Sequence, residues 1–181
     1  MAIEIEKKFR LSPAQSDAIR ASLEEFGAEY LGEDFEVNQI FGGPVLDAQG
    51  AVVRIRQIRD HAILTFKKRI DSNLAVKQQV EYESRVSDAE NIREILVAVG
   101  LKLRLVYEKR RRKWKFRSVE VVLDELPFGL FMEIEGSLTG IGEAEMLLDC
   151  EDLEPEFETY PRLTQSSGVI RDGIVEARFE P

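Results

Sequence analysis

The sequence contains almost none of the residues that thiol and zinc chemistry require. Its 181 residues include one cysteine, Cys150, and one histidine, His61. A lone cysteine cannot form an internal disulfide, and the usual zinc sites combine several Cys and His ligands. The sequence therefore argues against a disulfide, a thiol redox centre and a zinc site.

Long apolar runs are also missing. No segment approaches the roughly 20 consecutive apolar residues that a membrane-spanning helix needs, and the N-terminal stretch is charged instead of basic and then apolar. Hydrophobic residues make up 44% of the chain, which is enough to bury one sizeable core. We therefore expect a soluble, cytoplasmic protein in which residues 1–181 form a single domain.

The chain lacks the excess of positive charge that general nucleic-acid binding requires. Its formal net charge is −9, which argues against nucleic acid as a partner. Lys and Arg are nevertheless concentrated in residues 54–69 and 102–117, whereas acidic residues dominate from Glu120 onward. These two basic stretches need either an anionic ligand or a structural explanation.

Cap and turn signals predict a first helix after a charged strand. Ser12 suits the N-cap, Pro13 the first helical position and Gln15 the capping box, while Gly27 suits the end of the helix. Ser87 and Glu90 predict the start of a second helix that ends near Gly100. A third helix is expected over residues 143–148, and the acidic segment 150–161 is expected to be irregular.

Alternating apolar and charged residues predict most of the remaining structure as strands. Asp60 and His61 are predicted to form the turn of a hairpin. The strands are expected over residues 3–10, 51–59, 62–69, 75–86, 103–116, 118–126 and 130–137. The predicted class is α+β, with antiparallel strands that form either a flat sheet with one wet face or a closed barrel.

Strand alternation gathers charges of one kind on one face of nearly every strand. In "IEIEKKFR", Glu4, Glu6 and Lys8 share the face opposite Ile3 and Ile5. The same alternation groups the following residues on charged faces: Arg54 and Arg56, Lys67, Glu81 and Glu83, Lys109 and Arg111, Asp124, and Glu133 and Glu135.

These charged faces have two interpretations. They are either solvated outer faces, or the lining of a barrel whose apolar faces pack outward against helices. Charge inside a barrel is costly unless it is paired or binds a charged ligand. A polyphosphate with a hard divalent cation would suit such a lining, because bases bind phosphate oxygens and carboxylates bind Mg²⁺ or Mn²⁺.

The ordered motifs resemble those of the CYTH superfamily, the triphosphate tunnel metalloenzymes, which include class IV adenylyl cyclases and thiamine triphosphatases. The N-terminal Glu-x-Glu-x-Lys is followed in the family's order by "RIR", "LTFKKR", "EYE", "EKRR", "LDEL" and "FMEIEG". The resemblance covers residues 2–136 and extends weakly to Tyr160. Residues 137–181 are expected to form a helical and acidic C-terminal part.

The resemblance implies an eight-stranded antiparallel barrel with helices outside, which holds a triphosphate and Mg²⁺ or Mn²⁺. Lys8 and Lys67 would be catalytic, and Glu81 and Glu83 would balance bases in the tunnel. The residues implied to bind phosphates are Lys8, Arg54, Arg56, Lys67, Lys109 and Arg111. The implied metal ligands are Glu4, Glu6, Asp124, Glu133 and Glu135.

The sequence departs from the family pattern at one position that bears on catalysis. Many triphosphatase members carry a tyrosine before "RIR" that pairs with the lysine matching Lys67, whereas this chain offers Ile40 and Phe41. A bound metal could still activate water. The leading expectation is metal-dependent hydrolysis of the terminal phosphate of an inorganic or organic triphosphate, such as tripolyphosphate or thiamine triphosphate. The alternatives are a class IV adenylyl cyclase that makes cyclic AMP from ATP, and a polyphosphate- or nucleotide-binding module without turnover. A homodimer is compatible with the sequence.

Other conspicuous residues receive structural interpretations. His61 is interpreted as an exposed turn residue, Trp114 as a packing residue and Cys150 as a small core or rim residue. In "EKRRRKWK", alternation places Arg110 and Arg112 on the face opposite Lys109. That face is expected to be solvated, with neither nucleic acid nor membrane as a partner.

Overall fold

The computed structural model describes residues 2–59, 61–70 and 77–180, with side chains except at positions 2–4, 69, 77 and 78. The strands are β1 (Ala2–Leu11), β2 (Glu29–Gly42), β3 (Ala51–Ile58), β4 (His61–Ile70), β5 (Lys77–Val86), β6 (Lys102–Phe116), β7 (Val119–Leu126), β8 (Gly129–Glu135), β9 (Glu154–Pro155), β10 (Val169–Arg171) and β11 (Ile174–Ala177). The helices are α1 (Pro13–Glu25), α2 (Pro44–Ala48), α3 (Ala89–Ala98), α4 (Leu138–Leu147) and α5 (Tyr160–Ser167).

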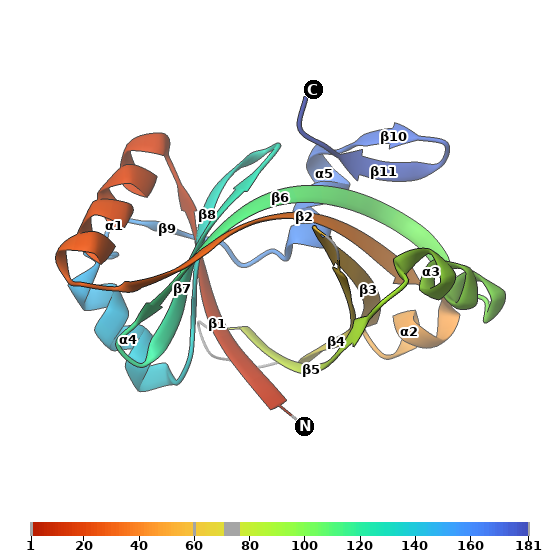
Figure 1. Cartoon of the computed structure of the whole chain (residues 1–181), viewed down its shortest axis with the longest axis horizontal. Coiled ribbons are helices and arrows are strands. Elements are labelled where there is room, and N and C mark those ends of the chain that lie inside the picture. Colours follow the sequence, from red (N-terminus) through yellow and green to blue (C-terminus); the bar gives the residue numbers. More distant parts are fainter. Residues whose placement is uncertain (1, 60, 71–76, 181) are drawn as a thin grey trace.

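Eight long strands pair antiparallel in a ring. The order is β6-β2-β3-β4-β5-β1-β8-β7, and β7 pairs with β6 again. Figure 1 shows these strands around an interior, with the hairpin β10–β11 outside the ring beside β6. The predicted α+β class is confirmed, and the strand pairings follow the closed alternative instead of a flat sheet.

The apolar strand faces pack outward against helices. One core joins Phe9 and Trp114 of the ring to Leu23 of α1 and Ile141 of α4, and all four are buried. A second joins Phe41 and Ile55 to α3, on the opposite side of the ring in Figure 1. Because apolar residues occupy the outer faces, alternation turns the charged residues inward. The packing role predicted for Trp114 agrees with this position.

A third cluster brings helix α5 against one part of the ring interior. It includes Ile40, Tyr107 and Phe131 from the strands and Tyr160 and Leu163 from α5. Aromatic rings interlock there, with ring centroids 5.4 Å apart for Phe131 and Tyr160. The apolar cluster therefore borders the charged interior.

The first predicted helix is confirmed, and the second begins differently. Ser12 and Gln15 form the expected capping box of α1. The N-cap of α3 is Asp88 instead of Ser87, because the Asp88 side chain accepts a hydrogen bond from the Asn91 backbone N–H at 2.9 Å. Carboxylates suit this position because they also interact favourably with the helix dipole.

Three further expectations needed correction. Helix α4 begins at Leu138 instead of residue 143, with Ser137 as its N-cap, because two glycines obscure the helical pattern. The segment predicted to be irregular contains β9, which pairs with β1, and the start of α5. His61 begins β4 opposite Ile58, so it lies in a strand; Asp60 lies outside the described residues.

Residues 75 and 76 of the predicted strand over 75–86 also lie outside the described residues, and β5 covers the rest. In the ranges that the structure describes, no helix combines the length and the apolar character needed to cross a membrane. Cys150 is buried as a free thiol, and burial raises its pKa to about 12. A thiol with this pKa stays protonated, as expected for a packing residue.

The two glycines of α4 should respond oppositely to alanine. A Cβ at Gly140 would lie 2.7 Å from Ser118 Oγ and 2.9 Å from Val119 Cγ1, whereas a Cβ at Gly142 would meet nothing within 4 Å. We expect Gly140→Ala to lower the free energy of unfolding by about 1–3 kcal/mol through overpacking. Gly142→Ala should raise it by up to about 1 kcal/mol through helix propensity. Urea denaturation of both variants measures this, and equal effects would contradict the packing of α4.

Candidate active site

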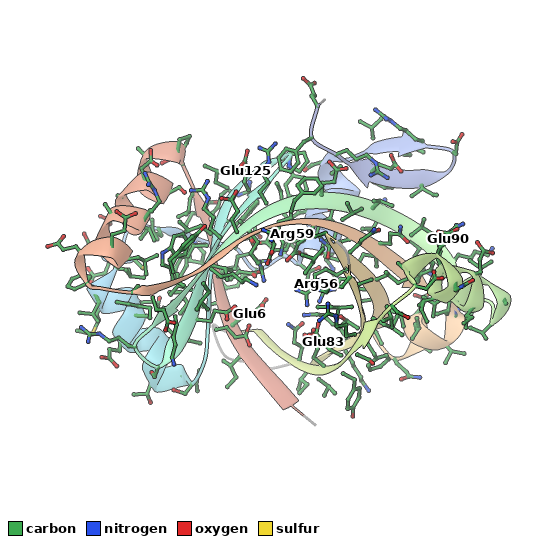
Figure 2. All side chains as sticks on the ribbon, viewed as in Figure 1. Glu6, Arg56, Arg59, Glu83, Glu90 and Glu125 are labelled. Carbon is green, nitrogen blue, oxygen red and sulfur yellow. The ribbon has the colours of Figure 1, made fainter. Side chains whose placement is uncertain are left out.

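The ring encloses a cavity of about 640 Å³ with charged walls. Figure 2 shows Arg56 and Glu83 directed toward each other inside the ring, and Glu6 on β1 at its edge, whereas Glu90 of α3 lies outside. The predicted site residues that line the cavity are Glu6, Lys8, Arg54, Arg56, Lys67, Glu81, Glu83, Lys109, Arg111, Glu133 and Glu135. The structure thus brings together side chains from six strands of the ring.

Two arginines of β3 have guanidinium groups with spare donors. Arg54 Nη2 lies 3.3 Å from Thr65 Oγ1 and 3.3 Å from Glu83 Oε1, and Arg56 Nη2 lies 2.8 Å from Glu83 Oε1. Among the described residues, neither Arg54 Nε nor Arg56 Nε has a hydrogen-bond partner, although both atoms are buried. Buried N–H groups without an acceptor are uncommon in native proteins. The two Nε atoms therefore offer donors to an anionic ligand.

A buried carboxylate of β2 lies between the bases of β3 and β6. Glu36 Oε2 lies 3.2 Å from Lys109 Nζ, and Glu36 Oε1 lies 3.8 Å from Arg56 Nη1. Burial alone would raise the pKa of Glu36, but Lys109 and Arg111 hold it well below the usual value. Glu36 is therefore ionised at neutral pH and balances the bases on both sides.

Three more bases face acids across neighbouring strands. Lys8 Nζ lies 3.1 Å from Glu133 Oε1, and Lys67 forms an ion pair with Glu81. Arg111 donates to both oxygens of Asp124 and to Glu133 Oε2. Glu81, for which a balancing role was predicted, is therefore paired with Lys67.

Asp124 lies behind Arg111 and is almost completely buried, at 1% exposure. Its Oδ2 accepts a hydrogen bond from the Tyr160 hydroxyl at 2.7 Å and lies 3.5 Å from Lys109 Nζ. Lys8 Nζ is 3.6 Å from the centroid of the Tyr160 ring. Burial and the charge of Arg111 lower the pKa of Lys109, whereas Asp124 and Glu36 oppose that shift. Tyr160 thus connects α5 to both lysines.

Three glutamates lie in one row across adjacent strands. Glu6 is opposite Glu135, and Glu135 is opposite Glu120, with all three on the cavity wall. Desolvation first, and then the charges of Glu6 and Glu120, raise the pKa of Glu135. Crowded carboxylates of this kind are stabilised by a cation.

The carboxylates of the cavity wall are ligands of the kind that a hard divalent cation prefers. Glu6, Glu133 and Glu135 supply carboxylate oxygens on the cavity wall, and the register that places Glu6 and Glu120 opposite Glu135 gathers negative charge that a cation would offset. Within the described residues, no three Asp, Glu, His or Cys side chains are grouped closely enough to hold a metal. The side chain of Glu4, also predicted as a ligand, lies outside the described residues.

Sequence reasoning missed several residues of the cavity. Glu36 on β2, Lys113 on β6 and Glu120 on β7 line the cavity, and Asn38 lies beside Glu36 on β2. Asn38 is fully buried and donates from Nδ2 to Glu36 Oε2 at 3.3 Å. The available signal was strand alternation, because residues an even number of positions apart share a face. Glu36 and Asn38 share a face with Ile40, Lys113 with Lys109, and Glu120 with Asp124. The residues of β2 were missed because no strand was predicted over residues 29–42.

The position of the missing tyrosine is apolar. Ile40 of β2 lines the cavity directly opposite Arg54, whereas Phe41 points outward into the core with α3. Tyr107 of β6 lines the same cavity. The side chain of Arg110 lies outside, where it pairs with Glu125 at 3.1 Å as alternation predicts.

Comparison with known proteins supports the resemblance. The CYTH domain profile matches residues 2–156. A candidate adenylate cyclase of Methanocaldococcus jannaschii is 25% identical, over 97% of this chain and 98% of its own. A structure of a Pyrococcus horikoshii protein has a TM-score of 0.78 and 25% identity, covering 88% of this chain and 98% of its own.

A Hippeastrum protein has the same fold. It was described as a candidate adenylyl cyclase with a dominant triphosphatase activity, and its TM-score is 0.68 at 17% identity. The comparison covers 94% of this chain and 98% of the Hippeastrum chain. Because the profile matches most of its length and the charged motifs line one cavity, the chain belongs to the CYTH domain family.

Proposed function

We propose that this protein is a divalent-metal-dependent enzyme that hydrolyses the terminal phosphate of a triphosphate. Water would attack the terminal phosphorus in line with the phosphoanhydride oxygen, which leaves with the diphosphate. The observation that carries this proposal is the pair of buried Nε donors of Arg54 and Arg56, which have no hydrogen-bond partner among the described residues and lie beside the charged cavity. An unsatisfied buried donor costs about 1–3 kcal/mol, and a phosphate oxygen would satisfy it.

The basic and acidic residues of the cavity have different proposed roles. Arg54, Arg56, Lys109 and Arg111 come from β3 and β6, on the two sides of β2, and would hold phosphate oxygens. Lys8 and Lys67 would bind phosphates too and neutralise charge that develops during hydrolysis. Glu81 and Glu83 would keep these bases charged and oriented before a triphosphate binds, which is consistent with their ion pairs to Arg54, Arg56 and Lys67.

Glu6, Glu133 and Glu135 would hold Mg²⁺ or Mn²⁺, because hard cations prefer carboxylate oxygens. Glu4 and Asp124 are proposed for the same role from the family motifs alone. When bound, the cation supplies positive charge beside the phosphates and makes coordinated water more acidic.

Cyclisation of ATP is the second candidate. The M. jannaschii relative is named for that activity and matches along nearly the whole chain. The cavity volume of about 640 Å³ falls in the range of about 300–1,000 Å³ typical of pockets for larger organic ligands. Such a pocket leaves room for a nucleoside beside the phosphates.

One experiment separates these functions. Purified protein is incubated with Mg²⁺ or Mn²⁺ and with tripolyphosphate, thiamine triphosphate or ATP, and the products are identified. Release of orthophosphate supports the hydrolase, and cyclic AMP with pyrophosphate supports the cyclase. Tight binding without products would indicate a binding module, and neither binding nor turnover would contradict all three.

Arg56→Ala should weaken triphosphate binding. The variant loses a charge-assisted hydrogen bond, worth about 1.5–3 kcal/mol, so we expect the Kd for tripolyphosphate to rise about 10- to 150-fold in calorimetry. Arg110→Ala is the matched control, because Arg110 lies on the same sheet but outside the cavity. Equal affinity in Arg56→Ala and Arg110→Ala would argue against the cavity as the binding site.

Glu6→Gln should separate metal binding from folding. The amide keeps the shape but removes one charge of the glutamate row, so the metal-free variant should be at least as stable as wild type. The rise in melting temperature that Mg²⁺ or Mn²⁺ gives to wild type should shrink, and activity should recover partly at higher metal concentration. Lys8→Ala should not show this recovery. Full metal-induced stabilisation of Glu6→Gln would exclude Glu6 as a ligand.

A further inference from the structure

Tyr160 is the first residue of α5 and lies beyond residues 2–156, which the family profile matches. It is buried, and its ring packs against the rings of Phe131 and Tyr107, with centroids 5.4 and 6.2 Å away. Its hydroxyl donates a hydrogen bond to Asp124 Oδ2 at 2.7 Å. Packing and this hydrogen bond together fix the ring in the cavity wall.

The face of this ring lies against the ammonium group of Lys8. Lys8 Nζ is 3.6 Å from the ring centroid, and Lys8 is only 3% exposed. The ring quadrupole attracts an ammonium in this position, and the attraction is stronger when the pair is shielded from water. Lys8 Nζ also donates to the Glu158 carbonyl oxygen at 3.3 Å. The ring and the carbonyl both belong to the segment that leads into α5.

The chain between β9 and α5 is held along β1 beside Lys8. Strand β9 pairs antiparallel with β1. The Glu156 N–H then donates to the Lys8 carbonyl oxygen at 2.8 Å, and the Glu156 carboxylate forms an ion pair with Arg10 at 2.8 Å. These contacts place the Glu158 carbonyl and the Tyr160 ring beside the Lys8 side chain.

The ring and the carbonyl hold the Lys8 ammonium without cancelling its charge, because both groups are neutral. Glu133 is different, since its Oε1 lies 3.1 Å from Lys8 Nζ and carries negative charge. Glu133 is also one of the carboxylates proposed to hold the divalent cation, and a carboxylate that binds a cation attracts an ammonium less strongly. Lys8 therefore needs an anchor that does not depend on Glu133.

We propose that Tyr160 is a positioning residue whose aromatic face holds the Lys8 ammonium in place to meet a phosphate oxygen. The inference rests on the proposed hydrolysis of a triphosphate and adds to it a residue of α5 that the sequence motifs did not assign. Lys8 would neutralise charge that develops during hydrolysis, so a loss of its position should lower kcat.

The first test compares Tyr160→Leu, which removes the aromatic face, with Tyr160→Phe, which removes only the hydroxyl. Loss of a shielded cation–π contact corresponds to about a 10- to 30-fold effect. We expect kcat for tripolyphosphate with Mg²⁺ to fall by about that factor in Tyr160→Leu and less than about threefold in Tyr160→Phe. Equal values of kcat in the two variants would overturn the inference.

Phe157→Leu is the matched control, because Phe157 lies in the same segment and is 58% exposed. It should have the kcat of wild type. Melting temperatures show whether each variant is folded, and Tyr160→Met, which fills more of the space, replaces Tyr160→Leu if that variant does not fold.

A double-mutant cycle tests whether Tyr160 acts through Lys8. In a Lys8→Ala background, with residual kcat measured at high enzyme concentration, Tyr160→Leu should lower kcat less than about twofold. A further loss of about tenfold in that background would show that Tyr160 acts independently of Lys8 and would contradict the inference.

An NMR measurement decides the inference without any triphosphate. The two Cε protons of a lysine have different shifts when the side chain is held over a ring, and averaged shifts when it moves freely. In protein labelled with ¹³C-lysine, the Lys8 signals are assigned by their absence in Lys8→Ala. We expect them to be separate in wild type and Tyr160→Phe and merged in Tyr160→Leu.

Separate Lys8 signals in Tyr160→Leu would exclude the positioning role, even if wild type hydrolyses triphosphates. Conversely, merged signals in Tyr160→Leu, found in a protein whose wild type binds no triphosphate, would contradict the proposed function and leave the positioning of Lys8 intact.

Discussion

Direct opposition of bases and acids on neighbouring strands is the interaction on which this interior depends. A closed ring with charged residues inside would be unstable if like charges met without partners. Here the three lysines predicted to bind phosphates, and Arg111, each lie directly opposite a carboxylate on a neighbouring strand. The opposed pairs are Lys8 with Glu133, Lys67 with Glu81, Lys109 with Glu36, and Arg111 with Asp124. The strand register therefore sets the charge balance of the interior.

The same pairs explain how a charged cavity can be stable before it binds a ligand and still bind one. Phosphate oxygens can take the place of carboxylates around the bases, and a divalent cation can take the place of ammonium groups around the acids. A triphosphate with its cation would thus exchange one set of ion pairs for another. The β3 arginines differ from the lysines, because their Nε atoms have no partner among the described residues to exchange.

The outer helices and the C-terminal segment make this interior possible. Helices α1, α3 and α4 cover the apolar faces of the ring, which leaves the charged faces inside. Helix α5 follows the segment that the family profile matches, yet Tyr160 donates to Asp124 and packs against Lys8. The C-terminal part therefore contributes to the order of the cavity, and the aromatic cluster around Tyr160 and Tyr107 links it to β6.

The sequence by itself determined the α+β class, the capping box of α1 and the face on which each recognised charged residue lies, because these depend on local periodicity. It did not reveal Glu36 or Asn38, since no strand was predicted over residues 29–42. It also did not reveal the start of α4, where Gly140 packs against Ser118 and Val119. Only the tertiary structure decided that Asp124 lies behind Arg111 and that Tyr160 of α5 donates to it. Which residues oppose each other depends on strand register, and register is set by the packing of all strands together, so one strand's alternation cannot specify it.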